Sequence, residues 1–159
     1  MFKVRPNGAT IILYRFTGGA DGAFPGAGLT GDAGNLFGTT PLGGGVVFEL
    51  SPTGTETVLY SFCAQAACAD GGGPVAGLIR DAAGNLYGTT SGGGDFACSC
   101  GVVFKVDPTG HETVLYTFRG GADGADPEAG LVRDAAGNLY GTTRAGGASG
   151  LGVVFKLTP

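Results

Sequence analysis

The octapeptide AGNL(F/Y)GTT occurs three times in this chain of 159 residues, at positions 33–40, 83–90 and 136–143. Its asparagines, Asn35, Asn85 and Asn138, follow one another at intervals of 50 and 53 positions. Self-similarity at a period near fifty residues is typical of arrays in which one structural unit recurs. The chain is therefore interpreted repeat by repeat, as a single repeat domain, 1–159, with approximate units 2–47, 48–103 and 104–159.

Each repeat carries four short apolar segments that have the composition of β-strands. In the second repeat these are GLIRD, LYGTT and GVVFKV, followed by TVLYTF. They are rich in β-branched and aromatic residues, and Gly, Pro, Asn or Asp bounds each of them. Pro-Thr-Gly, with Pro presetting φ and Gly accepting a positive φ, supplies the turn before the last segment. We expect each repeat to form a four-stranded antiparallel meander.

Composition and charge narrow the class of protein further. Glycine contributes 34 residues, but 43% of the chain is apolar and clustered in the strand segments, which indicates a folded, loop-dense all-β protein. The net charge is −4 and the nine Lys and Arg residues lie singly, so no nucleic-acid partner is expected. No apolar run reaches the length of a membrane helix, so no membrane insertion is predicted.

Two known repeat units contain four strands in about fifty residues: the blade of a β-propeller and the lobe of a β-trefoil. Strands of a trefoil barrel have one interior face, whereas a propeller blade lies between two others and is apolar on both faces. In GVVF, Val102 and Phe104 lie on one side and Val103 on the other. We therefore predict a β-propeller built from four-stranded antiparallel blades, three repeats per chain, with the β-trefoil as the alternative.

The run GLxxDAAGNLYGTT, followed by GVVFKLxPxG and TVLYxF, resembles the GloVer tandem repeat of bacterial surface and secreted proteins, named for Gloeobacter and Verrucomicrobium. More loosely, the D-x-x-G-N-L-Y core and the following V-F-K-L-x-P-x-G strand resemble blades of NHL and gluconolactonase-like propellers. The resemblance implies a propeller fold and an extracellular or cell-surface setting in a bacterium, with the signal and anchor outside this sequence. It implies no chemistry.

The third repeat lacks its last strand. If blades start at AGL, two are complete, 27–62 and 76–118, while 129–159 stops after its third strand. A matching outer strand, TIILYRF, stands at 10–16, and we expect it to complete the last blade, in cis or in trans. Because propeller rings commonly use four to eight blades, three cannot close a ring. We expect a homodimer that forms a six-bladed ring or, failing that, neighbouring repeats of a longer chain.

All four cysteines lie in the second repeat, in its two lengthened loops: Cys63, Cys68, Cys98 and Cys100. Three disulfide connectivities are open. Cys63–Cys68 is favoured, and Cys98–Cys100 is less well defined because one member of that C-x-C pair could reach across to the other loop. Zinc is the alternative, but C-x-C places two thiolates awkwardly, so no metal site is predicted. Disulfides indicate an oxidising compartment.

Acidic residues recur in the loop before each blade, and threonines end the LYGTT strand on the same loop face. The candidate ligand-binding residues are Asp21, Thr40, Asp70, Thr90, Asp123, Asp126 and Thr143. For a sugar, the threonines and aspartates of this face would form the site; for the aspartates alone, the alternative ligand is calcium, since carboxylates and carbonyls in glycine-rich loops suit a hard cation. The preferred interpretation is an Asp-Gly turn in which Asp bonds its own backbone, so no cofactor is predicted.

No catalytic constellation is found. The single histidine, His111, follows a Pro-Thr-Gly turn and is expected to be solvated, and no serine has a G-x-S-x-G context. We predict a noncatalytic extracellular module for scaffolding or interaction. The alternative is a lectin-like propeller that binds a glycan on the long-loop face, although the four strand tyrosines that could stack on sugars are assigned to the core. A propeller enzyme of lactonase or lyase type ranks third.

Overall fold

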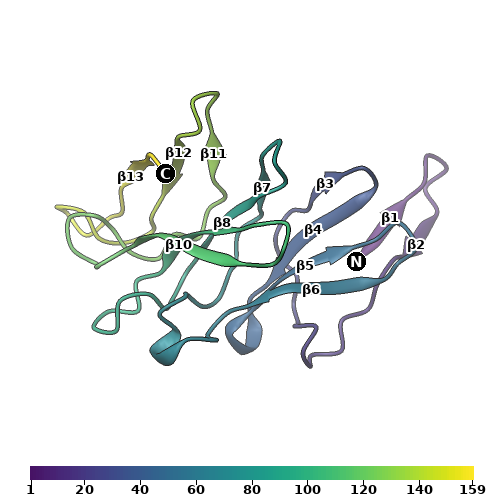
Figure 1. The fold of residues 1–159 in the computed structure, drawn as a ribbon, viewed down its shortest axis with the longest axis horizontal. Helices are drawn as coiled ribbons and strands as arrows, with labels where there is room; N and C mark the ends of the chain where they lie inside the picture. The colour runs from purple at the N-terminus through teal and green to yellow at the C-terminus, as the bar shows by residue number, and fades with distance from the viewer.

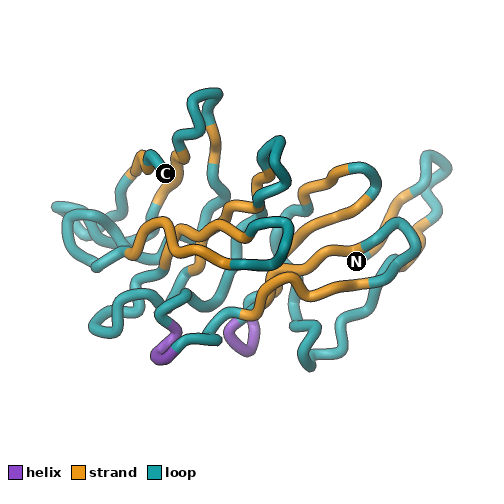
Figure 2. The backbone as a smooth tube through the Cα atoms, in the orientation of Figure 1, coloured by secondary structure: helices purple, strands orange, loops and turns teal.

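The computed structural model describes residues 1–159 as an all-β chain of thirteen strands in four antiparallel sheets, with two 3-10 turns at Leu42–Gly44 and Ala66–Cys68 (Figures 1 and 2). The strands are β1 (Phe2–Val4) and β2 (Thr10–Ile12); β3 (Thr30–Asp32), β4 (Asn35–Thr40), β5 (Val46–Leu50) and β6 (Glu56–Ser61); β7 (Ile79–Arg80), β8 (Leu86–Thr90), β9 (Val102–Val106) and β10 (Glu112–Thr117); and β11 (Val132–Arg133), β12 (Leu139–Thr142) and β13 (Val154–Leu157).

Strand order within each sheet follows the sequence, as expected for a meander. We call β3–β6 the first blade, β7–β10 the second and β11–β13 the third, and β1 pairs with β2 as a separate hairpin. The blades succeed one another in a row, with the N-terminal hairpin at one end and the three-stranded blade at the other (Figure 1). None of the helical segments has the length and hydropathy needed to cross a membrane.

Close packing inside a blade requires glycine at the centre of its second strand. Gly88 lies opposite Phe104 in the β8–β9 register, and a Cβ at this position would lie 2.7 Å from Cζ of Phe104 and 2.9 Å from Cδ2 of Leu78. Gly38 and Gly141 occupy the same position in the other two blades. The glycine of the repeated octapeptide therefore makes room for the aromatic ring of the third strand.

The core lies between blades. One cluster joins Phe37 and Val47 of the first blade to Leu78, Leu86 and other residues of the second. The next cluster repeats this contact between the second and third blades. Because the second blade contributes apolar side chains to both of its neighbours, both faces of its strands are buried, which is the pattern expected of propeller blades.

The same contacts recur at successive blade junctions. Aromatic rings pack edge-to-face between Phe62 and Phe104, with centroids 4.8 Å apart, and between Phe118 and Phe155 at 5.2 Å. Side-chain hydrogen bonds also cross the junctions: the Thr39 hydroxyl donates to the Ala76 carbonyl at 3.0 Å and the Thr89 hydroxyl to the Ala129 carbonyl at 3.3 Å. One type of interface is therefore used repeatedly along the chain.

The third blade ends at β13, whose outer edge has no strand partner. Val154 in β13 is 81% exposed, whereas Val47 and Val103, at the same position in the complete blades, are 0% exposed. Within this chain β2 pairs with β1 and not with β13. Completion of the third blade by residues 10–16 is thus not made in cis here, and completion in trans stays a prediction.

Candidate functional site

The repeated loop aspartates bind an outer-strand tyrosine. The tyrosine hydroxyl donates to the carboxylate in each repeat, in the pairs Tyr14–Asp21 at 3.1 Å, Tyr60–Asp70 at 2.8 Å and Tyr116–Asp123 at 3.0 Å. Backbone N–H groups at the end of the outer strand donate to the same carboxylates, from Thr17, Ala64 and Arg119 respectively. These aspartates therefore fasten each loop to the preceding strand, instead of bonding only their own turn as expected.

The hydrogen bonds change the acidity of these groups. Donation from the hydroxyl and N–H of Thr17 lowers the pKa of Asp21 below its ordinary value. Burial opposes ionisation of Asp123, but the N–H of Arg119 and the hydroxyl of Tyr116 outweigh it and lower its pKa. Burial, followed by the hydrogen bond to Asp70, raises the pKa of Tyr60. The lowered pKa values of Asp21 and Asp123 and the raised pKa values of Tyr14 and Tyr116 make these two pairs a carboxylate and a neutral phenol at neutral pH.

Two of the three candidate threonines, Thr90 and Thr143, have structural hydrogen bonds. The Thr90 hydroxyl donates to the Gly92 carbonyl at 2.9 Å and accepts from the Val102 N–H at 3.1 Å. Thr143 makes the equivalent bonds with Ala145 and Val153. The hydroxyl of Thr40 is buried with no partner. Thr90 and Thr143 therefore fix the loop between the second and third strands of the second and third blades.

Asp126 contributes through its backbone. Its N–H donates to the Cys100 carbonyl at 3.1 Å, and its carbonyl accepts from the Arg144 N–H at 3.0 Å. Nearby, Arg144 and Glu128 form an exposed ion pair at 3.4 Å. Nowhere do three or more His, Cys, Asp or Glu side chains come together in an arrangement that could hold a metal ion. The predicted ligand-binding residues lie in three different repeats.

In two repeats, the aspartate before the Gly-Asn turn accepts hydrogen bonds from the asparagine of that turn and caps it, as expected from the sequence. Asp81 accepts from the N–H of Asn85 at 2.9 Å and from its side chain at 2.9 Å, and Asp134 does the same with Asn138. Donation from the Asn138 side chain is the main cause that lowers the pKa of Asp134 to about 2. Asp32 differs, because it forms a 2.7 Å ion pair with Arg80 of the second blade.

The cysteines pair inside their own loops. Disulfides join Cys63 to Cys68 and Cys98 to Cys100, and no cysteine is free. Neither disulfide connects the two lengthened loops, a connectivity that remained possible from the sequence. The Cys63–Cys68 loop also holds Ala64 and Gln65, whose N–H groups bind Asp70. The first disulfide therefore constrains the loop that surrounds a buried carboxylate.

Two glutamates that sequence reasoning did not select lie at the start of outer strands. Glu112 is buried, its Oε1 has no hydrogen-bond partner, and burial followed by the charge of Asp70 raises its pKa to about 7. Glu56 repeats the arrangement beside Asp21, with its pKa raised for the same two reasons. Their signal in the sequence is the shared (T/H)ETVLY segment, in which the glutamate precedes the strand pattern.

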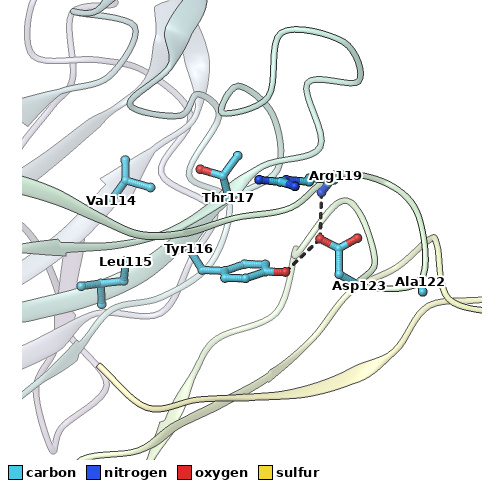
Figure 3. A pocket seen from close by; sticks show the side chains of 7 residues that line it. All are labelled: Val114, Leu115, Tyr116, Thr117, Arg119, Ala122 and Asp123. Carbon is cyan, nitrogen blue, oxygen red and sulfur yellow. Dashed lines mark hydrogen bonds between the residues drawn. The ribbon is translucent and has the colours of Figure 1, made fainter.

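A hollow of about 630 Å³ lies along the outer strand β10 and the loop that follows it. It contains Tyr116, Arg119 and Asp123, and the Tyr116 hydroxyl and the backbone N–H of Arg119 both donate to the Asp123 carboxylate (Figure 3). A second hollow of about 390 Å³ shares Tyr116 and Asp123 and extends along β13 from Val154 to Leu157. The two hollows share Tyr116 and Asp123, and we call them together the β13 groove, of which the second hollow reaches the unpaired strand of the third blade.

In the second blade the outer strand β10 pairs with β9 and occupies the corresponding edge. Val114 of β10 and Tyr60 of β6 pack against the core cluster between the first and second blades. In the third blade no strand takes the place of β10, and Tyr116 is 38% exposed. The groove therefore lies beside the edge at which the two complete blades have an outer strand.

The profile of the Gloeobacter/Verrucomicrobia repeat matches residues 1–159. The chain belongs to this repeat family. A solved structure of a protein assigned to the gluconolactonases aligns with 98% of this Gloeobacter/Verrucomicrobia repeat chain at a TM-score of 0.54 and 19% identity. The chain spans 55% of that protein's length. No curated protein matches the sequence. The resemblance of the Gloeobacter/Verrucomicrobia repeat chain to gluconolactonase-like propeller blades is confirmed at the level of fold.

Proposed function

We propose that this chain is a noncatalytic extracellular module that associates with further propeller repeats by accepting an outer strand in the β13 groove. The observation that carries the proposal is the free outer edge of β13, because the corresponding strands β5 and β9 pair with the outer strands β6 and β10. An apolar strand with one free hydrogen-bonding edge is a template for strand addition. The disulfides Cys63–Cys68 and Cys98–Cys100 support an extracellular setting.

Hydrogen exchange of the β13 amides tests the proposal. The chain is measured at high and low concentration, and again with an excess of a peptide that has the sequence of residues 54–62, an authentic outer strand. We expect β13 amides to become protected at high concentration or with the peptide, while a scrambled peptide has no effect. Exchange at the unprotected rate under all of these conditions would overturn the proposal.

Carbohydrate binding is the second candidate function. It is favoured by the exposed ring of Tyr116 beside the Asp123 carboxylate in an open hollow, since sugar sites combine an aromatic platform with a few polar groups. A glycan array measures it directly. Signal that is lost in Asp123→Ala and kept in Asp95→Ala would support this role, and an array without signal above background would reject it.

A further inference from the structure

We infer that the strand bound in the β13 groove is residues 10–16 of a second copy of this chain, so that two copies close one ring through two identical junctions. The inference rests on the proposed interaction role and specifies its partner. It requires that residues 10–16 leave β1 and pair with β13 of the other copy.

Repetition fixes the register of the inferred pairing. In the first blade Leu50 lies opposite Glu56, and in the second Val106 lies opposite Glu112. The N-terminal hairpin has the same register, with Val4 opposite Thr10. Since Phe155-Lys156-Leu157 matches Phe2-Lys3-Val4 in sequence position within the repeat, the inferred pair is Leu157 with Thr10 of the second copy.

The β1–β2 hairpin is a weak alternative to this pairing. Each of its strands is three residues long, and no further strand flanks β1. Phe2, Val4 and Ile12 are 63%, 57% and 47% exposed. Isolated two-stranded hairpins are at best marginally stable in water, whereas β13 is already backed by β12 and β11. Transfer of residues 10–16 to β13 exchanges a solvated pairing for one on a three-stranded sheet.

A second set of contacts at the blade junction points to the same partner. Thr39 and Thr89 donate to Ala76 and Ala129 of the following blade, but the equivalent Thr142 is exposed and has no such acceptor in this chain. The alanine at the same repeat position in the first blade is Ala27. The Thr142 hydroxyl is therefore placed to donate to the Ala27 carbonyl of the second copy.

The first blade is open on the side that would receive this contact. Leu29 is 42% exposed, while its counterparts Leu78 and Leu131, covered by a preceding blade, are each 5% exposed. Leu29 lies on the first blade and Val154 on the third. In the repeated interface, the counterparts of Leu29 contact the preceding blade and the counterparts of Val154 contact the following blade. Two copies joined this way leave neither half open, as in a closed twofold assembly.

The length of the gluconolactonase-like structure agrees with two copies per ring. One chain aligns over 98% of its own length with 55% of that propeller. Two chains thus supply about the amount of blade that one such fold contains. A continuing array of repeats in one longer chain is the other occupant of the groove, and the experiment separates it from a second copy.

Light scattering of the 159-residue chain measures the assembly. We expect a particle of twice the 15.6 kDa of one chain, and we expect Val154→Arg to reduce it to a monomer. Phe96→Arg is the matched control, because Phe96 is 88% exposed in a loop of the second blade outside the inferred junction, and it should stay dimeric. A monomeric wild type, an open polymer, or a dimer unaffected by Val154→Arg would each overturn the inference.

Cysteine cross-linking tests the strand exchange itself. Leu157→Cys combined with Thr10→Cys should give a covalent dimer on a gel without reductant. Leu157→Cys combined with Ile12→Cys, two positions out of register, should give much less. A dimer by light scattering that cross-links only through Val4→Cys and Thr10→Cys within one chain would show that the hairpin persists and would overturn the exchange. Protection of β13 by the added peptide, with no dimer, would leave the proposed function standing and reject this inference alone.

Discussion

The hydroxyl of Tyr60 donates a 2.8 Å hydrogen bond to Oδ2 of Asp70, a side chain with no exposed surface. The N–H groups of Ala64 and Gln65 donate to the same carboxylate at 3.0 and 3.3 Å. A buried carboxylate is stable only when donors satisfy it, and here all three donors come from the outer strand or the loop that follows it. The pair therefore holds the loop between the first and second blades in place.

Asp70→Asn should lower the free energy of unfolding by about 2 kcal/mol, because it weakens several charge-assisted hydrogen bonds at a buried site. Asp123→Asn is the matched control: it alters the same Tyr–Asp pair in the next loop, where the Tyr116–Asp123 bond is exposed, and should cost less than about 1 kcal/mol. Urea denaturation measures both. Equal losses for the two variants would contradict the role assigned to burial.

The Cys63–Cys68 disulfide and Asp70 should be energetically coupled. The bridge closes the loop whose Ala64 and Gln65 amides bind Asp70, so it prepares those donors before the carboxylate is bound. Loss of the bridge in a Cys63→Ser/Cys68→Ser variant should cost about 2 kcal/mol. A double-mutant cycle with Asp70→Asn should show a coupling energy above about 0.5 kcal/mol. Additive losses would mean that the loop is ordered without its bridge.

Much of the fold could be predicted because the sequence pattern of the strands recurs from one repeat to the next. The segments LYGTT and GVVF reappear with β-branched and aromatic residues on both faces, and the structure places Val102, Val103 and Phe104 fully inside. The absent outer strand of the third blade was also visible in the sequence. The repeat pattern does not determine which strand residues 10–16 pair with, because β1 and β13 carry the same sequence pattern.

The loop aspartates were harder to interpret because their partners are set by loop geometry. Tyr14 and Asp21 are seven positions apart, as are Tyr116 and Asp123, but the lengthened loop separates Tyr60 and Asp70 by ten. The recurrence of one tyrosine and one aspartate in every repeat was the available signal. The sequence-based interpretation assigned each aspartate to an Asp-Gly turn. It therefore assigned no hydrogen-bond partner to the tyrosine, which was placed in the core.

Gly88→Ala should destabilise the protein by about 1–3 kcal/mol, since its Cβ would overlap the ring of Phe104 from the adjacent strand. The control is Gly121→Ala, at a loop position with no atom within 4 Å of the added Cβ and no positive φ. That change should stay within about 0.5 kcal/mol of wild type. Thermal or urea unfolding measures both, and a tolerated Gly88→Ala would show that the third strand can shift away from its neighbour.

Glu112 should make the protein less stable as the pH rises through the neutral range. Burial and the negative charge of Asp70 raise the pKa of Glu112 from 4.5 to about 7, so between these values the folded chain holds a proton that the unfolded chain has released. The favourable contribution is complete below pH 4.5, and it is lost as the pH approaches and passes 7. Glu112→Gln removes the titrating group and should be the more stable protein at pH 8, by up to about 3 kcal/mol.

The comparison variant for this titration is Glu56→Gln. Its carboxyl occupies the same repeat position, its pKa is raised by burial and then by Asp21, and its side chain is less buried than that of Glu112. The gain in stability above pH 7 should therefore have the same sign and a smaller size. Urea denaturation at several pH values between 4 and 8 gives the slope for each protein. A Glu112→Gln variant that follows the wild-type slope throughout would show that the glutamate is solvated and ionised between the blades.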